Sequence, residues 1–325
     1  MTRSIQQRAE HAVARSLAIV EVIRQRSARH RPSFSLAAVK ALLAIALVVA
    51  VAAGQQGHSQ PPPLPALGAA GATQRAHLLA VADVGSGDAH QQAIADRMAD
   101  VHRQRPVDLV ILAGDNIYPD GDLSRVASTF ERPYRALLSA GVPFRAVLGN
   151  HDIRTANGDP QLAYPGFGMR GRWYQLRQGP VELFMLDTNM NAAWQHQLPW
   201  LKKALAASKA PWKFVVGHHP IYSSGFYGDD PSAIARLTPL FRQYGVNLYI
   251  NGHEHHYERS RPMDGTTYLQ VGGGGAALRP VLPSERSSMA ISRHSFAEIT
   301  ATASTLSLRA WDDQGRLIDS AEWSR

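Results

Sequence analysis

The chain has no cysteine among its 325 residues. A disulfide framework, a thiolate zinc site, an iron–sulfur cluster and a cysteine nucleophile are therefore all excluded. Charged residues are also sparse, at 18% of the chain, whereas hydrophobic residues make up 45%. That apolar content is far too high for an intrinsically disordered chain and is enough for one large domain or two small ones.

The excess of basic residues is confined to the N-terminal region. The net charge is +8, but residues 1–40 carry eight basic and two acidic side chains, and the remaining 285 residues carry 26 basic and 24 acidic ones. A basic surface over the folded part would favour nucleic-acid binding. Because the body of the chain is nearly neutral, we expect no nucleic acid partner.

A short apolar segment follows the basic region. Residues 41–54 read ALLAIALVVAVAAG, which is shorter than the roughly 20 residues of a membrane span and typical of a signal peptide. Ala50-Val51-Ala52 fits a cleavage site. The basic region is unusually long, however, and Lys40 could reach the membrane surface, so an uncleaved signal anchor is the alternative.

These features divide the chain into three parts. Residues 1–53 are predicted to be a basic region plus a signal peptide or signal anchor, through which membrane contact is possible. Residues 54–75 are rich in Pro, Gly and Ala and are predicted to be a linker. Residues 76–325, without an internal repeat or second linker, are predicted to form one domain. We therefore expect an exported protein, periplasmic or secreted, with membrane anchoring as the alternative.

Apolar runs in this domain repeatedly stop at polar residues. Five predicted strands, at 77–81, 107–112, 142–148, 212–216 and 246–250, are each followed by such a cluster. Helix-compatible stretches lie at 88–104, 123–139, 195–209 and 231–244, and the last third contains mostly strands. This alternation predicts a layered α/β fold with a mixed sheet or a two-sheet sandwich, and ligands at the carboxyl ends of the strands.

The polar clusters offer a set of oxygen and nitrogen donors without sulfur. Each residue alone has an ordinary structural explanation, such as a helix cap or a packed ring. If all five strand ends lie at the same edge of one sheet, however, their side chains converge, and this donor chemistry favours a site for two metal ions. The candidate ligands are Asp83, Asp115, Tyr118, Asn150, His218, His253 and His255.

In sequence order these blocks resemble the calcineurin-like metallophosphoesterases, and within them the purple acid phosphatases. The family pattern DxG, GDxxY, GNH(D/E), VxxH and GHxH appears here at residues 83–85, 114–118, 149–152, 215–218 and 252–255. One departure is Ala82, where many relatives have Gly. The resemblance implies a β-sandwich flanked by helices, in four α/β/β/α layers, with residues 76–325 as the catalytic domain.

The resemblance also implies roles for the metal ligands. Asp83, Tyr118 and His255 would hold a ferric ion. Asn150, His218 and His253 would hold a divalent ion (Fe, Zn or Mn), and Asp115 would bridge the two. A phenolate such as Tyr118 is a hard anionic donor that needs a strongly charged ion to stay deprotonated.

The implied reaction is hydrolysis of a small phosphate monoester by metal-activated water, as in an acid phosphatase. His151, next to Asn150, is the candidate for protonating the leaving group. His219, next to His218, is a second catalytic candidate that would face the substrate. The roles of Glu254 and His256, and the oligomeric state, stay open.

Two other functions compete with this one. A phosphodiesterase or nucleotide pyrophosphate hydrolase could use the same scaffold, although Tyr118 argues against it. A metal-binding protein without turnover would be expected to lack a ligand or His151, and the sequence contains them all.

Overall fold

The computed structural model describes residues 75–325. The predicted signal segment at residues 1–53 and the predicted linker up to residue 74 lie outside the described residues. Within the described part, no helix has both the length and the apolar character that crossing a membrane requires.

The described residues alternate strands and helices before ending in strands. The strands are β1 (Arg75–Val81), β2 (Leu109–Leu112), β3 (Phe144–Ala146), β4 (Tyr174–Gln178), β5 (Val181–Met185), β6 (Trp212–Val216), β7 (Leu248–Asn251), β8 (Tyr257–Ser260), β9 (Thr267–Val271), β10 (Ser287–Ile291), β11 (Ser295–Thr302), β12 (Thr305–Asp312) and β13 (Leu317–Ser324). The α-helices are α3 (Ala89–Gln104), α4 (Arg135–Ser139), α5 (Asp159–Ala163), α6 (Trp194–Ala207) and α7 (Pro231–Tyr244).

The strands form two sheets. The six-stranded sheet has the order β13-β12-β11-β1-β2-β3, and the seven-stranded sheet has the order β10-β8-β9-β7-β6-β5-β4. Strands β1, β2 and β3 are parallel, as are β5, β6, β7 and β9, and the other pairs are antiparallel. Each sheet therefore has a parallel centre whose carboxyl ends share one edge.

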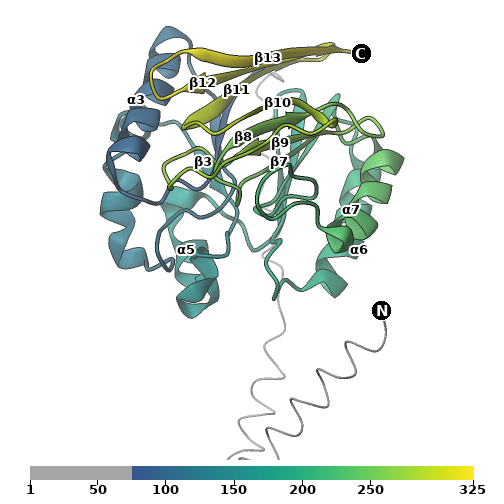
Figure 1. Cartoon of the computed structure of the whole chain (residues 1–325). Helices are drawn as coiled ribbons and strands as arrows, with labels where there is room; N and C mark the ends of the chain where they lie inside the picture. Colours follow the sequence, from purple (N-terminus) through teal and green to yellow (C-terminus); the bar gives the residue numbers. More distant parts are fainter. Residues whose placement is uncertain (1–74) are drawn as a thin grey trace, which may run out of the picture. The chain divides into compact units, whose positions relative to one another are not determined.

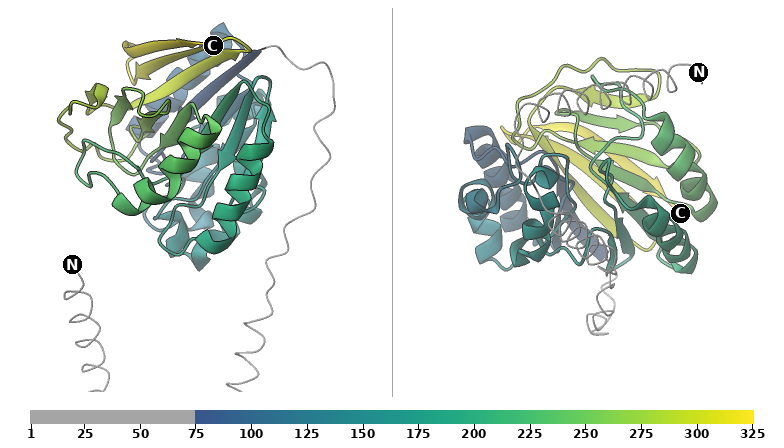
Figure 2. Two further views of the ribbon diagram at one scale, coloured as in Figure 1. Left: turned by 90° about the vertical axis from the view of Figure 1, so that its right-hand side faces the viewer. Right: turned by 90° about the horizontal axis from the view of Figure 1, so that it is seen from below.

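The two sheets pack against each other, and helices cover their outer faces. Leu78 and Ile111 of the six-stranded sheet share one apolar core with Phe214 and Ile250 of the seven-stranded sheet. On the outer faces, α3 and α4 pack on the first sheet and α6 and α7 on the second. Figure 1 and the two views of Figure 2 show these helices on opposite sides of the sheets. The expected four-layer α/β/β/α sandwich is confirmed.

Central strands are buried on both faces, which explains their continuous apolar sequences. In β1, Leu78 and Ala80 face the core between the sheets, whereas Leu79 and Val81 face α3. Successive residues of a strand point to opposite faces, so a strand between two apolar layers needs an apolar residue at every position.

Two expectations about the fold were wrong in detail. The predicted helix at 123–139 is broken into Leu123–Arg125, Ala127–Glu131 and α4. Pro133 lies at the second break, where it removes a backbone donor. The five polar strand ends also do not share one sheet, because β1, β2 and β3 belong to one and β6 and β7 to the other.

Candidate metal centre

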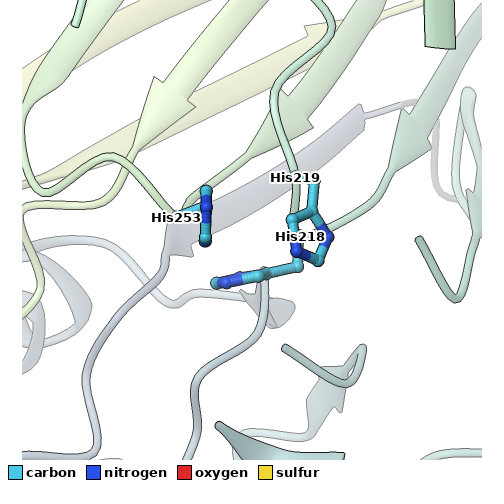
Figure 3. A group of neighbouring side chains, drawn as sticks. All are labelled: His218, His219 and His253. Atoms are coloured by element: carbon cyan, nitrogen blue, oxygen red, sulfur yellow. The ribbon is translucent and has the colours of Figure 1, made fainter. Parts of the chain in front are cut away.

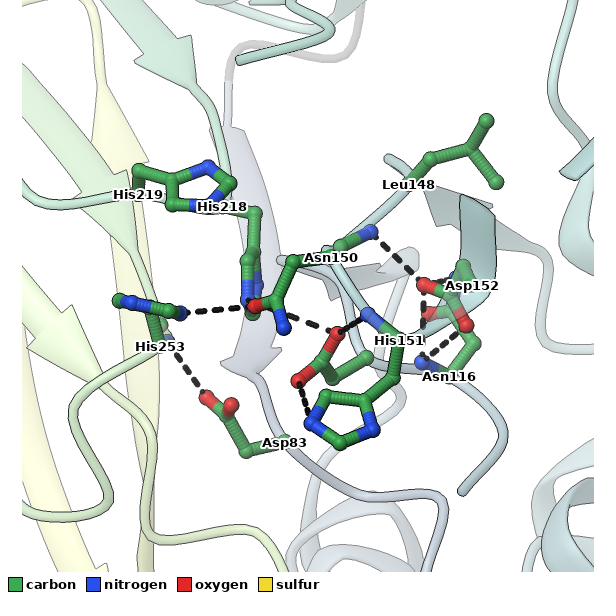
Figure 4. A network of polar contacts seen from close by, with 12 residues as sticks. Asp83, Asn116, Leu148, Asn150, His151, Asp152, His218, His219 and His253 are labelled. Carbon is green, nitrogen blue, oxygen red and sulfur yellow. Dashed lines mark hydrogen bonds and ion pairs between the residues drawn. The ribbon is translucent and has the colours of Figure 1, made fainter. Parts of the chain in front are cut away.

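The seven predicted ligands lie on the loops that follow β1, β2, β3, β6 and β7. These loops come from both sheets of the sandwich, and their side chains meet at the shared carboxyl edge. Figure 4 shows part of this meeting point, with Asp83 from the first sheet facing His253 from the second. The side chains form two groups.

The first group consists of Asp83, Tyr118 and His255. The Tyr118 hydroxyl donates to Asp83 Oδ1 at 3.1 Å and lies 3.4 Å from His255 Nε2. His255 Nε2 is also 3.4 Å from Asp83 Oδ1. Three donor atoms from three distant segments thus converge on one point, as ligands of a common ion do.

The second group consists of Asn150, His218 and His253. Asn150 Oδ1 lies 2.8 Å from His253 Nδ1 and 3.1 Å from His218 Nε2. Figure 4 shows the Asn150 side chain next to His218, with a dashed line to His253. An amide oxygen and imidazole nitrogens suit a borderline divalent ion.

Asp115 lies beside the second group and near Asp83. Its Oδ1 is 3.5 Å from His218 Nε2. Asp83, Asp115 and His218 each offer a ligand atom, and these atoms all lie within 4.8 Å of one another. A carboxylate in this place can reach both groups.

Backbone carbonyls orient two of the imidazoles. His218 Nδ1 is 2.9 Å from the Ala113 carbonyl oxygen, and His255 Nδ1 is 2.8 Å from that of Ala277. Donation from Nδ1 leaves the Nε2 lone pair directed at the carboxylates, which is the tautomer a metal requires.

The electrostatics of the site fit a bound cation. Asp83 and Asp115 are buried side chains. Burial, together with the nearby charges of Asp83 and Asp115, raises the pKa of Tyr118 well above its usual value. Burial and the neighbouring His218 and His219 lower the pKa of His253 to about 2, so this imidazole is neutral. A Tyr118 phenolate here therefore needs a cation, and the residues present fit a metal.

The backbone of the site is held in unusual conformations. Asp83, Asp115 and His253 all have positive φ values, of 58°, 54° and 72°. Such conformations cost free energy in non-glycine residues and persist where the surrounding structure enforces them. At Gly252 and Gly149 a Cβ atom would collide with the carboxylates of Asp83 and Asp115, respectively. Glycine at both positions lets the loops approach closely.

Asp152 ties two of the loops together. This buried carboxylate accepts hydrogen bonds from the backbone N–H groups of Asn116 (3.0 Å) and Gly149 (2.7 Å) and from the side chain of Gln161 (2.9 Å). Figure 4 draws this network next to the donor groups. Asp152 therefore supports the loops that carry Asp115 and Asn150, as expected of a residue that helps to position ligands.

His151 faces the centre. Its Nδ1 donates to the Pro119 carbonyl oxygen at 2.5 Å, and its ring packs edge-on against Tyr118 with centroids 4.5 Å apart. Its Nε2 is 3.9 Å from Asp115 Oδ2 and accepts from the guanidinium of Arg154 at 3.2 Å. Arg154 at this position was not anticipated from the sequence, although Arg154 lies only three residues after His151.

His219 lies on the other side, beside the second group. Its Nδ1 is 3.0 Å from Thr188 Oγ1, and its ring centroid is 4.6 Å from that of His253. Figure 3 shows His218, His219 and His253 facing one another, and a nitrogen from each lies within 4.8 Å of the others. Burial and the neighbouring His218 lower the pKa of His219 to about 3, so it is neutral.

Comparison with known proteins identifies the family of the chain. The calcineurin-like phosphoesterase family model matches residues 76–257. Purple acid phosphatase 7 of Arabidopsis thaliana is 32% identical over 232 residues, which cover 62% of this chain and 70% of the relative. Human tartrate-resistant acid phosphatase type 5 is 30% identical over 250 residues, covering 65% of this chain and 76% of the relative.

A solved structure shares the fold. The purple acid phosphatase PPD1 of yellow lupin superposes with a TM-score of 0.69 at 22% identity, covering 77% of this chain and 54% of the lupin chain. The chain thus spans about half the length of that protein. The family model covers more than half of the chain, and the relatives named above are phosphatases that imply a dinuclear metal centre. The chain therefore belongs to the calcineurin-like phosphoesterase family, as a metallophosphoesterase related to the purple acid phosphatases.

Proposed function

We propose that the chain hydrolyses small phosphate monoesters with a ferric ion and a divalent ion. The ferric ion would bind the first donor group, and the divalent ion (Fe, Zn or Mn) would bind the second. The contact that carries this proposal is the Tyr118 hydroxyl, 3.1 Å from Asp83 Oδ1 inside the first group. The proposed ligands are Asp83, Tyr118 and His255 for the first ion, Asn150, His218 and His253 for the second, and Asp115 as the bridge.

The bound ions would supply Lewis acidity and lower the pKa of a bound water. We assign the proton for the leaving group to His151. Because Nδ1 donates to the Pro119 carbonyl, Nε2 is the atom that gains and releases this proton. The guanidinium of Arg154 beside it can contact the substrate phosphate as well.

We assign to His219 a contact with the substrate. Its ring is partly exposed and packs against His253, while Thr188 holds its Nδ1. A neutral imidazole in this place can donate a hydrogen bond to a phosphate oxygen without adding charge.

Export is a separate proposal that rests on residues outside the described part. Residues 41–54 are uncharged and Ala50-Val51-Ala52 follows the pattern of a cleavage site. If cleavage occurs there, mass spectrometry of the exported protein should find an N-terminus near Ala53. An intact leader in the membrane fraction would favour an anchored protein.

The function is tested by metal analysis and kinetics on the purified protein. Two ions per chain and faster hydrolysis of phenyl phosphate than of bis(4-nitrophenyl) phosphate are expected. The reverse preference would identify a phosphodiesterase, and full metal content without turnover would identify a binding protein.

Asp115→Asn tests the bridge. Asp115 is placed to reach both groups, so removing its charge should lose metal from both positions and lower kcat by at least roughly a hundredfold. Asp96→Asn, on the exposed face of α3, is the matched control and should change neither. Full occupancy of both sites in an active Asp115→Asn protein would contradict the bridging role.

A further inference from the structure

The loop after β6 carries two exposed aromatic side chains at the edge of the metal centre. It spans residues 222–229 and follows His219 and Pro220. Phe226 is 80% exposed and Tyr227 is 52% exposed. Large apolar side chains at such exposure cost free energy in water, so their position next to a functional site points to a ligand.

Tyr227 is in direct contact with a proposed metal ligand. Its ring stacks on the imidazole of His253, with centroids 4.4 Å apart and planes 27° from parallel. The Arg279 guanidinium carbon lies 5.1 Å from the Tyr227 centroid, and Arg279 also donates to the His253 carbonyl oxygen at 2.7 Å. The stacking and cation–π contacts hold the tyrosine ring against the second donor group.

Two buried carboxylates anchor the loop through hydrogen bonds. Glu254, which has no exposed surface, accepts a hydrogen bond from the backbone N–H of Tyr227 at 2.5 Å. Glu258 accepts from the backbone N–H of Ser224 at 2.9 Å and from its hydroxyl at 2.6 Å. A Cβ on Gly225 would lie 2.7 Å from Glu254. Glu254, between the ligands His253 and His255, thus fixes the loop.

Phe226 lies next to Tyr227 in this loop. Its ring lies edge-on to Tyr227, with centroids 5.2 Å apart and planes at 83°. Tyr227 in turn stacks on His253, so Phe226, Tyr227 and His253 form a chain of neighbouring rings. A phosphate ester held at the second donor group would therefore have Tyr227 as a neighbour on the His253 side, with Phe226 next to it.

We propose that Phe226 and Tyr227 form a leaving-group subsite that selects phosphate esters of flat aromatic alcohols. The inference rests on the proposed function and deepens it by naming the substrate class. An aromatic leaving group removes part of the exposed Phe226 ring from water and makes edge or face contacts with it, whereas a small polar alcohol does neither. The fixed loop lowers the entropy cost of this contact.

The test compares phenyl phosphate, 2-naphthyl phosphate and glycerol phosphate on the full, metal-loaded chain. Phe226→Ala is expected to lower the ratio of kcat/KM for phenyl phosphate to that for glycerol phosphate by roughly tenfold, and more for naphthyl phosphate. Phe226→Leu keeps an apolar side chain but has no flat ring, so its kcat/KM ratio should lie between those of the wild type and Phe226→Ala. Leu317→Ala, 50% exposed at the start of β13, is the control and should leave the ratio unchanged.

Binding of phosphonates separates this proposal from the proposed function. Phenylphosphonate and methylphosphonate are not hydrolysed, so calorimetric titration measures the subsite even if the wild type has no turnover. The subsite is supported if the wild type binds phenylphosphonate more tightly than methylphosphonate and if Phe226→Ala removes this difference. The proposal would be overturned if Phe226→Ala changed the affinity for both phosphonates equally and left the kcat/KM ratio unchanged. If Phe226→Ala instead left the kcat/KM ratio unchanged but lost binding to anionic vesicles, Phe226 would be assigned to a membrane-binding surface.

Discussion

At the scale of single residues, Tyr118 has the environment that most needs a cation. Its hydroxyl donates to Asp83, and burial and the carboxylates of Asp83 and Asp115 raise its pKa. Phenolate formation is therefore unfavourable in the metal-free site and becomes favourable only with a strongly charged ion.

Tyr118→Phe removes one oxygen and keeps the ring. Charge transfer from a phenolate to a ferric ion absorbs visible light, so the wild type should be coloured and Tyr118→Phe should not be. The variant should also retain less iron, measured by elemental analysis together with the visible spectrum. A colourless wild type that is shown to be loaded with ferric iron would rule out Tyr118 as a ligand.

His151→Ala tests proton donation at the leaving group. Poor leaving groups depend on a proton donor more than activated ones do, so kcat for an alkyl phosphate should fall by roughly a hundredfold and that for 4-nitrophenyl phosphate by much less. Metal content should stay unchanged. Equal losses on both substrates would mean that His151 only positions the phosphate. Phe226→Ala is expected to have the opposite effect, because it should lower the activity on aryl phosphates more than the activity on alkyl phosphates.

At the scale of elements, an ionic cluster around the buried Glu298 joins the end of α3 to the six-stranded sheet. Glu298 of β11 lies 2.9 Å from His77 Nε2 of β1 and 2.5 Å from the Arg105 guanidinium just after α3. Trp311 of β12 donates to the same carboxylate at 2.9 Å. Burial alone would raise the pKa of Glu298, but these hydrogen bonds outweigh it and lower the pKa to about 2.

This cluster predicts a pH dependence of stability away from the metal centre. Because the folded-state pKa of Glu298 lies below its ordinary value of 4.5, its contribution is complete above about pH 5 and is lost as the pH falls toward 2. Glu298→Gln should lower the free energy of unfolding by roughly 2 kcal/mol at pH 6. Chemical denaturation at pH 6 and pH 3 should find that the difference from wild type shrinks at the lower pH.

Glu322→Gln is the matched control for that experiment, because Glu322 is exposed on β13. It should leave stability nearly unchanged at both pH values. A Glu298→Gln effect that is the same at pH 6 and pH 3 would show that the loss comes from packing rather than from the ionised carboxylate.

At the scale of the whole molecule, the proposed metal ions would join the two sheets. Asp83, Tyr118 and Asn150 follow strands of the six-stranded sheet, whereas His218 and His255 follow strands of the seven-stranded sheet. Without metal, the buried carboxylates of Asp83 and Asp115 lie near each other and less positive charge compensates their negative charges. Binding to the folded state alone stabilises that state.

Removal of metal should therefore lower the melting temperature by about 10 °C, the shift expected for roughly 4 kcal/mol in a domain of this size. Differential scanning calorimetry before and after chelation, with metal content checked, measures this. Restoring the divalent ion should recover part of the shift. An unchanged melting temperature after verified metal loss would contradict a role of the ions in joining the sheets.

Much of the fold was predictable because its signals are local. Strands β1, β6 and β7 and helices α3 and α7 lie within a few residues of the predicted segments. The predicted helix at 123–139 was wrong because Pro133 lacks a backbone N–H group and interrupts the helical hydrogen bonds. Strands β4 and β5 were not among the expected strands, although Gly179-Pro180 between two apolar stretches is a hairpin signal.

The candidate donor residues and their order along the chain could be predicted from the sequence, because residue type and position after an apolar strand are local properties. That Asp83 and His255 meet across two sheets follows from the folded structure, since sheet membership depends on which strands pair. The folded structure alone also placed Tyr227 on His253 and Glu254 beneath the loop. Those contacts join segments that are far apart in the sequence, and no local pattern predicts that they meet. They form only when the two sheets pack together.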